Sequence, residues 1–153
     1  MSPADRLPPP VLSDDGWCFV CGQENPLGLR LAWMLRADGR AAARFRAGRH
    51  HQGWIGVVHG GILAAVLDEA MAQRLRLGGL RTVTAKLEIR YRRPTPIDTP
   101  LVAEGWVESE SAHGMRLRAT VCDEGGTCFA EALGTCVRIE SEARPPVDEA
   151  AAS

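Results

Sequence analysis

The sequence predicts an α+β domain in which an antiparallel sheet of about six strands wraps around one long helix. Three observations carry this prediction. The stretch VHGGILAAVLDEAMAQ, residues 58–73, has a helical pattern and is apolar on nearly every side, which is typical of a buried helix. Alternating apolar and polar residues mark strands on both sides of it. Turn signals such as Asp38-Gly39 divide these strands at short spacing, as in antiparallel hairpins.

The composition is that of one globular domain. The 153 residues are 45% apolar and 24% charged, and the net charge is -1 with no basic block. Nucleic-acid binding through phosphate neutralisation is therefore excluded as a main role. No run is long and apolar enough to span a bilayer, and the first fifteen residues lack the apolar segment of a signal peptide. We expect a cytoplasmic protein with no membrane partner, whose five cysteines are mostly reduced thiols.

The two ends differ from the middle of the chain. Residues 1–16 and 141–153 are rich in proline and charge, so we expect loose tails around a domain of residues 17–140. A turn-rich segment, residues 17–28, opens the domain, and the helix is expected to end near Gly78-Gly79. The expected strands are Leu29–Leu35, Arg40–Phe45, Arg81–Arg92, Leu101–Ser109, Met115–Cys122 and Cys128–Ile139.

The third of these strands alternates without interruption. Val83, Ala85 and Leu87 fall on one face, and Thr84 and Lys86 on the other. Strict alternation therefore predicts that Thr84 and Leu87 point to opposite sides of the sheet.

Two carboxylates interrupt the apolar helix. Asp68 and Glu69 point about 100° apart, so at most one of them easily faces solvent. A buried carboxylate is costly unless it is paired or used. We therefore expect chemistry at Asp68, with Glu69 as the runner-up base. A paired structural role for Asp68 is the alternative.

These residues are similar to a known family. VHGGILAAVLDEAMA, followed by TAKLEIRYRRP, resembles the phenylacetate-pathway and 4-hydroxybenzoyl-CoA branch of the hotdog-fold acyl-CoA thioesterases, from about residue 18 to 139. CFVCGQENPLGLRL resembles the N-terminal signature of one bacterial subgroup. The resemblance implies a hotdog fold, hydrolysis of a small or aromatic acyl-CoA thioester, and a homodimer or homotetramer with the site between subunits.

The resemblance also implies roles for single residues. The family's catalytic carboxylate falls on Asp68, its oxyanion-binding N–H on Gly60, its orienting hydroxyl on Thr84 and its histidine on His59. Many members carry Asn or Gln six residues before the histidine, where this chain has Gly53. The adjacent Gln52 and His51 are the candidates to replace that polar group, and both are predicted to lie near the substrate.

The chemistry of thioester hydrolysis supports these roles independently. Negative charge develops on the carbonyl oxygen, and free N–H groups at a helix N-terminus, here Gly60 and Gly61, stabilise it. A carboxylate two turns into the helix, here Asp68, attacks the carbonyl or takes a proton from water. His59 fits a capping or positioning role better than that of a base. Thr84 fits a catalytic role and an ordinary strand position equally well.

Two further groups have competing interpretations. Lys86, with Arg90, Arg92 and Arg93, forms a basic strip that either is a solvated sheet face or binds the phosphates of coenzyme A. Cys18-x-x-Cys21 suggests zinc, but a zinc site needs about four ligands and no second pair follows. We therefore predict buried thiols, no metal site and no cofactor.

Two other functions remain open. The first is a catalytically silent acyl-CoA-binding protein, which would keep Gly60, Gly61 and the basic strip but lack the polar group at Gly53. The second is a hydratase or dehydratase, which ranks low because no separate His and Asp pair precedes the helix.

Overall fold

The computed structural model describes residues 13–139. The predicted tail 141–153 and most of the predicted tail 1–16 lie outside the described residues, so their looseness stays a prediction. Asp14, at the described end of the first tail, pairs with Arg76 across 2.9 Å.

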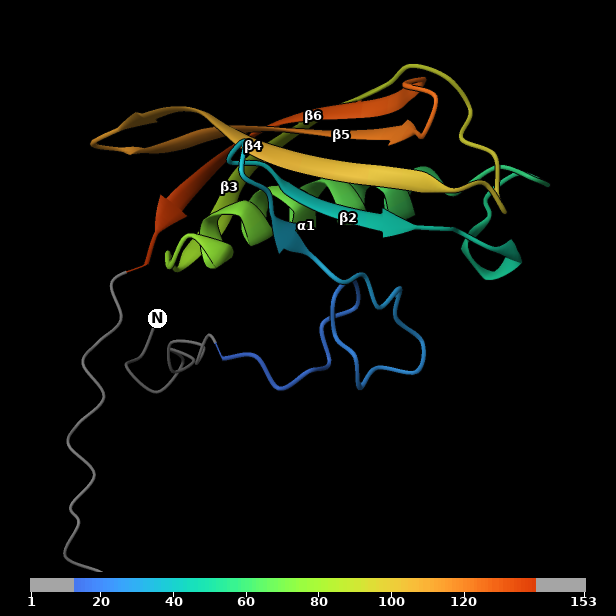
Figure 1. Ribbon diagram of the computed structural model, residues 1–153, viewed down its shortest axis with the longest axis horizontal. Helices are drawn as coiled ribbons and strands as arrows, with labels where there is room; N and C mark the ends of the chain where they lie inside the picture. Colours follow the sequence, from blue (N-terminus) through green and yellow to red (C-terminus); the bar gives the residue numbers. More distant parts are fainter. Residues whose placement is uncertain (1–12, 140–153) are drawn as a thin grey trace, which may run out of the picture.

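A six-stranded antiparallel sheet packs on one long helix (Figure 1). The strand order is β1-β2-β4-β5-β6-β3, and a short 3-10 turn, Arg49–His51, precedes the helix. This arrangement confirms the predicted fold class and the order of its elements. The helix and strands are α1 Gly60–Leu77, β1 Met34–Leu35, β2 Ala41–Phe45, β3 Thr82–Tyr91, β4 Leu101–Ser111, β5 Gly114–Asp123 and β6 Cys128–Arg138.

The first strand is much shorter than predicted. Residues 29–33 are not part of β1, because the backbone there pairs with the preceding turn instead of the sheet. The Leu29 N–H donates to the carbonyl of Phe19 and the Leu31 N–H to that of Val20, each across 2.8 Å. The turn-rich segment is thereby fastened to the domain, and the Val20 and Leu31 side chains join the core.

Helix α1 crosses the sheet with one side fully buried. Val66, Leu67, Ala70 and Met71 have no exposed surface and form the middle of the core. The other side is not buried as predicted: Gly61 is exposed, and Ala64, Ala65, Asp68 and Glu69 are only half-buried. The expectation of burial on every side is therefore wrong for the single chain.

A β-bulge in β3 corrects the predicted alternation. Thr84 pairs with Cys136 and Lys86 pairs with Thr135, so Ala85 is the extra residue. The bulge turns Thr84 toward the helix, on the same face as Leu87, which packs on the core. The prediction that Thr84 and Leu87 lie on opposite faces is wrong because one inserted residue reverses the alternation.

Candidate active site

The N-terminus of α1 has one N–H group, that of Gly60, with no acceptor in the described part of the chain. His59 is the N-cap, and its Nδ1 accepts a hydrogen bond from the Gly61 N–H across 2.8 Å. The Ile62 N–H donates to the His59 carbonyl. For the Gly60 N–H, no acceptor lies within residues 13–139. Of the two glycines predicted to bind an oxyanion, Gly60 offers a free donor and Gly61 does not, because His59 occupies its N–H.

Tyr91 holds this end of the helix. Its hydroxyl donates to the Gly60 carbonyl across 2.7 Å, and its ring lies 3.4 Å from the position of a Cβ on Gly60. A side chain at Gly60 would crowd this ring, so glycine gives the closest access to the amide. Sequence reasoning placed Tyr91 only in a strand pattern and missed this contact, since a hydroxyl reaching a carbonyl thirty-one positions away leaves no local signal.

Asp68 and Thr84 are brought together, as the resemblance implied. The Thr84 hydroxyl donates to Asp68 Oδ1 across 2.7 Å from the bulged strand. The thiol of Cys136, which is 1% exposed, lies 3.8 Å from the Thr84 oxygen. Burial raises the pKa of this thiol, and the nearby Asp68 charge raises it further, so Cys136 is a neutral neighbour of the carboxylate.

The loop before the helix uses its polar side chains internally. Gln52 Oε1 accepts from the Gly56 N–H across 3.1 Å, and His51 Nδ1 accepts from the Gly48 N–H across 3.1 Å. Burial lowers the pKa of His51, and the charge of His50 lowers it further. Gly53 faces His59, whose Cδ2 lies 3.4 Å from the position of a Cβ on that glycine. The acceptors of Gln52 and His51 are thus taken up in shaping the loop.

The arginines of the basic strip differ in their ion pairs. Arg92 pairs with Glu131 across 2.7 Å, and this hydrogen bond lowers the pKa of the Glu131 carboxyl. Arg90 and Arg93 are exposed, and neither forms an ion pair with any residue from 13 to 139. They lie in sequence on either side of Tyr91, which touches the helix N-terminus.

A second polar cluster lies on another side of α1. The Cys18 thiol donates to Glu69 Oε2 across 3.7 Å. The amide of Gln73, itself 4% exposed, donates to Glu69 Oε1 across 2.7 Å and to Cys21 Sγ across 3.4 Å. Glu69 is therefore engaged away from Thr84, and within residues 13–139 the side chains of Glu69 and Asp68 have no hydrogen-bond partner in common.

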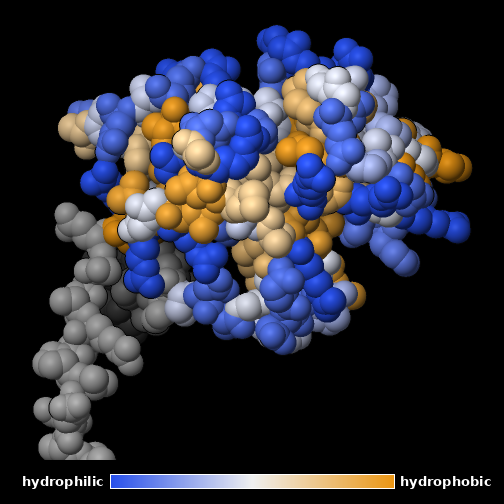
Figure 2. Space-filling view, in the orientation of Figure 1, coloured by the Kyte–Doolittle hydropathy of each residue, from blue (hydrophilic) through white to orange (hydrophobic). Residues whose placement is uncertain are grey.

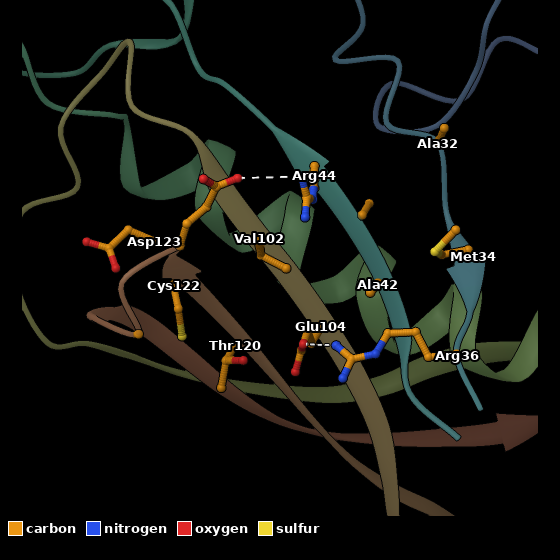
Figure 3. Close-up of a pocket in the computed structure, with 13 residues that line it drawn as sticks. Ala32, Met34, Arg36, Ala42, Arg44, Val102, Glu104, Thr120, Cys122 and Asp123 are labelled. Atoms are coloured by element: carbon orange, nitrogen blue, oxygen red, sulfur yellow. Dashed lines mark hydrogen bonds and ion pairs between the residues drawn. The ribbon is translucent and has the colours of Figure 1, made fainter. Parts of the chain in front are cut away.

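The cavities differ in whether predicted site residues line them. A cavity of about 1050 Å³ lies on the sheet face away from α1, and none of the predicted site residues line it (Figure 3). Ion pairs of Arg36 with Glu104 and of Arg44 with Glu124 cross it. A smaller cavity of about 380 Å³ lies at the helix entrance, lined by Gly53, His59 and Gly60. Size alone therefore does not mark the site.

Within residues 13–139, no helix combines the length and the apolar character needed to cross a bilayer. The cytoplasmic location expected from the sequence stays a prediction.

Comparison with known proteins gives consistent matches. A model of the thioesterase superfamily matches residues 55–130, about half of the chain. Acyl-coenzyme A thioesterase THEM4 of Bos taurus is 28% identical over 127 residues, which are 81% of this chain and 52% of that protein. The chain thus spans about half the length of the curated relatives it matches.

Solved structures share the fold. A crystal structure of a thioesterase superfamily protein matches with a TM-score of 0.76 and 28% identity, over 85% of this chain and 72% of that one. The BH2602 protein of Bacillus halodurans, crystallised with CoA, matches with a TM-score of 0.65 and 28% identity, over 74% of this chain and 76% of that one. With its sheet of six strands around one helix, the chain therefore belongs to the thioesterase superfamily and has the hotdog fold.

Proposed function

We propose that this protein hydrolyses acyl-CoA thioesters, with a small or aromatic acyl group as substrate. The observation that carries the proposal is the Asp68 carboxylate, half-buried and held by Thr84, on the helix whose first amide, at Gly60, is free. The names of the curated relatives and the CoA in the Bacillus halodurans structure support a CoA thioester over other esters.

The roles follow from the chemistry of the reaction. The Asp68 carboxylate attacks the thioester carbonyl or takes a proton from the attacking water. In both routes the C–S bond breaks and CoA leaves as its thiolate, which then takes up a proton. Water adds to the acyl carbon, either directly or by hydrolysing the acyl-Asp68 anhydride, and the acyl group leaves as the acid. Thr84 fixes Oδ1 and leaves the second oxygen of the carboxylate for the reaction. The Gly60 N–H, at the positive end of the helix dipole, stabilises the charge that develops on the carbonyl oxygen. Asp68 and Gly60 touch the reacting atoms, and Thr84 is a positioning residue.

The two reacting groups of one helix are too far apart to act on one thioester. Gly60 and Asp68 are eight residues apart, which is about 12 Å along the axis. An oxyanion donor lies about 3 Å from the oxygen, the carbonyl bond is about 1.2 Å, and a nucleophile approaches the carbon to about 3.5 Å. For direct attack by Asp68, these lengths sum to less than about 8 Å. A productive site therefore combines Gly60 of one chain with Asp68 of another.

Self-association fits the surface of the single chain. Strand β3 is ten residues long and lies at one edge of the sheet, where its outer side has no strand partner within residues 13–139. Trp54 and Ile55, in the loop beside the helix entrance, are 86% and 94% exposed. Apolar side chains also reach the surface in the middle of the view in Figure 2. Large exposed apolar side chains beside an incomplete site are typical of an interface.

We expect a homodimer or homotetramer in solution. Sedimentation at micromolar concentration should give a mass of at least two chains, and charges placed on the apolar loop by Trp54→Glu with Ile55→Glu should lower both the mass and the turnover. The matched control Leu27→Glu changes another exposed apolar residue, 82% exposed, outside this loop. A fully active monomer would contradict the shared site.

We assign the phosphates of CoA to Arg90 and Arg93, which have no ion-pair partner among the described residues. Arg90 and Arg93 are exposed and lie close in sequence to Tyr91, whose hydroxyl reaches the helix entrance, while the charge of Arg92 is partly satisfied by Glu131. Guanidinium groups bind phosphates through two parallel hydrogen bonds, so unpaired arginines are the better candidates.

Thr84→Val tests the positioning role. The change keeps the volume and removes one hydrogen bond to a charged acceptor, worth about 1.5 kcal/mol, so turnover should fall about 10-fold with little change in KM. Thr120→Val, on the sheet face away from the helix, is the matched control. Equal turnover in both variants would show that Thr84 has only a structural place in the strand.

A silent acyl-CoA-binding protein is the second candidate. The absence of a side chain at Gly53, together with the occupied acceptors of Gln52 and His51, favours it. A single-turnover assay over a panel of acyl-CoA thioesters, with detection of free thiol, separates the two functions. Release of CoA supports the enzyme, and tight binding without release supports the silent protein.

A further inference from the structure

Three metal-ligating side chains meet on the side of α1 that carries Glu69. The Sγ atoms of Cys18 and Cys21 and a carboxylate oxygen of Glu69 lie within 4.8 Å of one another. No other group of three such side chains comes this close within residues 13–139. The tight turn after Trp17, closed by the Gly22 N–H on the Cys18 carbonyl across 2.9 Å, brings both thiols to the same side.

The spacing suits a tetrahedral ion. Zinc binds thiolate at about 2.3 Å and carboxylate at about 2.0 Å, which places the two ligand atoms about 3.5 Å apart in a tetrahedron. Cys18 Sγ and Glu69 Oε2 are 3.7 Å apart without any ion. Two thiolates and one carboxylate form the kind of donor set that binds zinc, whereas magnesium and calcium prefer oxygen ligands alone.

The surroundings orient the ligands and leave one position open. The buried Gln73 amide donates to Glu69 Oε1 and to Cys21 Sγ, as the groups behind metal ligands commonly do. Cys18, Cys21 and Glu69 line a cavity of about 590 Å³, through which a water molecule could reach a bound ion as its fourth ligand. Asp14 faces this cavity but is paired with Arg76, and Arg81 adds a second positive charge to its wall.

Metal binding by this cluster should depend on pH. Thiolates rather than thiols are metal ligands, so a divalent cation takes the place of the thiol protons of Cys18 and Cys21. Binding should therefore release protons and strengthen as the pH rises.

We propose that Cys18, Cys21 and Glu69 bind a zinc-class divalent cation, with Gln73 as the positioning residue behind the ligands. The proposal departs from the expectation of no metal, which looked for further ligands among the cysteines and histidines and did not consider the carboxylate that the helix supplies. The ion would clamp the segment of residues 17–28 onto α1, one residue from Asp68. The site is separate from the proposed thioester chemistry and does not depend on it.

Cobalt titration of the reduced, full-length protein tests the proposal. Co²⁺ should bind at about one ion per chain, with thiolate-to-cobalt charge-transfer absorption and the intense visible bands of a tetrahedral site, and Zn²⁺ should displace it. Gln73→Leu should weaken binding about 10- to 100-fold. Cys18→Ser, Cys21→Ser and Glu69→Gln should each weaken it more. Cys122→Ser, which removes a thiol on the far sheet face, should leave it unchanged.

Different results overturn the proposal. If the charge-transfer band is absent, or if it persists in Cys18→Ser and Cys21→Ser, these two cysteines do not bind the ion and the proposal is wrong. A Cys18–Cys21 disulfide found by peptide mass in air, with no cobalt bound after reduction, would make the pair a redox pair instead. Thermal unfolding, with and without Zn²⁺, separates loss of the site from loss of the fold. The ion should raise the Tm of the parent chain and of Cys122→Ser, and not that of Cys18→Ser.

Discussion

Asp68→Asn is expected to lower the turnover of an acyl-CoA thioester by about 10² to 10⁴, the usual worth of a positioned acid–base group. The amide has the shape of the carboxylate and still accepts the Thr84 hydroxyl, whose oxygen lies 2.7 Å from Oδ1 in the parent chain. It cannot attack the thioester or hold the proton of water. KM should change little, because the phosphates of CoA are held by other residues.

Glu69→Gln is the informative comparison, because the two carboxylates are neighbours in sequence and differ in contacts. Glu69 binds Gln73 and faces Cys18, so its loss of charge should cost far less turnover than that of Asp68. If Glu69→Gln silences the protein while Asp68→Asn remains active, the assignment is wrong by one residue. If both variants remain active, a carboxylate mechanism is wrong for this chain. Thermal unfolding measured beside turnover identifies a variant that fails only because it unfolds.

Local patterns were enough to predict the overall fold. The apolar helix, the alternating strands and the turn dipeptides each depend on residues a few positions apart. Among the α-helix and the six strands, all but one lie within two residues of their predicted ends. The exception is β1. Its expected first residues, Leu29 and Leu31, are bonded to a turn ten positions earlier, and a long-range choice between two backbone partners has no local signal.

Only part of the site was predictable, because only part of it has a local signal in the sequence. Asp68 interrupts an apolar helix, which marks it locally, but Thr84 reaches it only through the bulge at Ala85. Periodicity alone placed Thr84 on the wrong face, whereas the resemblance to a family placed it correctly beside the carboxylate. Glu69, Cys18 and Cys21 meet across about fifty positions, so only the folded chain brings three ligands together.

Gly105→Ala is expected to destabilise the fold by about 3 kcal/mol or more, the upper end of the cost of overfilling a core. Gly105 lies in β4 where α1 crosses the sheet, and an added Cβ would lie 2.2 Å from the carbonyl oxygen of Ala70 and 3.0 Å from the nitrogen of Met71. Both obstacles are helix backbone, which no change of rotamer moves away. The helix must shift as a body, and interiors transmit such strain because they are close-packed.

Two other glycines provide a graded comparison in denaturant unfolding. A Cβ on Gly134 would meet the Met71 side chain at 2.7 Å, and a thioether moves aside, so Gly134→Ala should cost less than Gly105→Ala. A Cβ on Gly125 would meet only the Asp123 carboxylate at 3.4 Å in a turn, so Gly125→Ala should be nearly neutral. Equal stabilities for all three variants would show that the helix is not held against β4.

The shift of α1 expected in Gly105→Ala should also disturb the Asp68–Thr84 pair. Asp68 lies two residues before Ala70, and its bond to Thr84 has a length of 2.7 Å with little tolerance for movement of the helix over the sheet. Gly105→Ala assayed well below its unfolding temperature should therefore lose turnover in addition to stability, whereas Gly125→Ala should lose neither. Loss of stability with full turnover would mean that α1 adapts locally at Ala70 and leaves the Asp68–Thr84 pair in place.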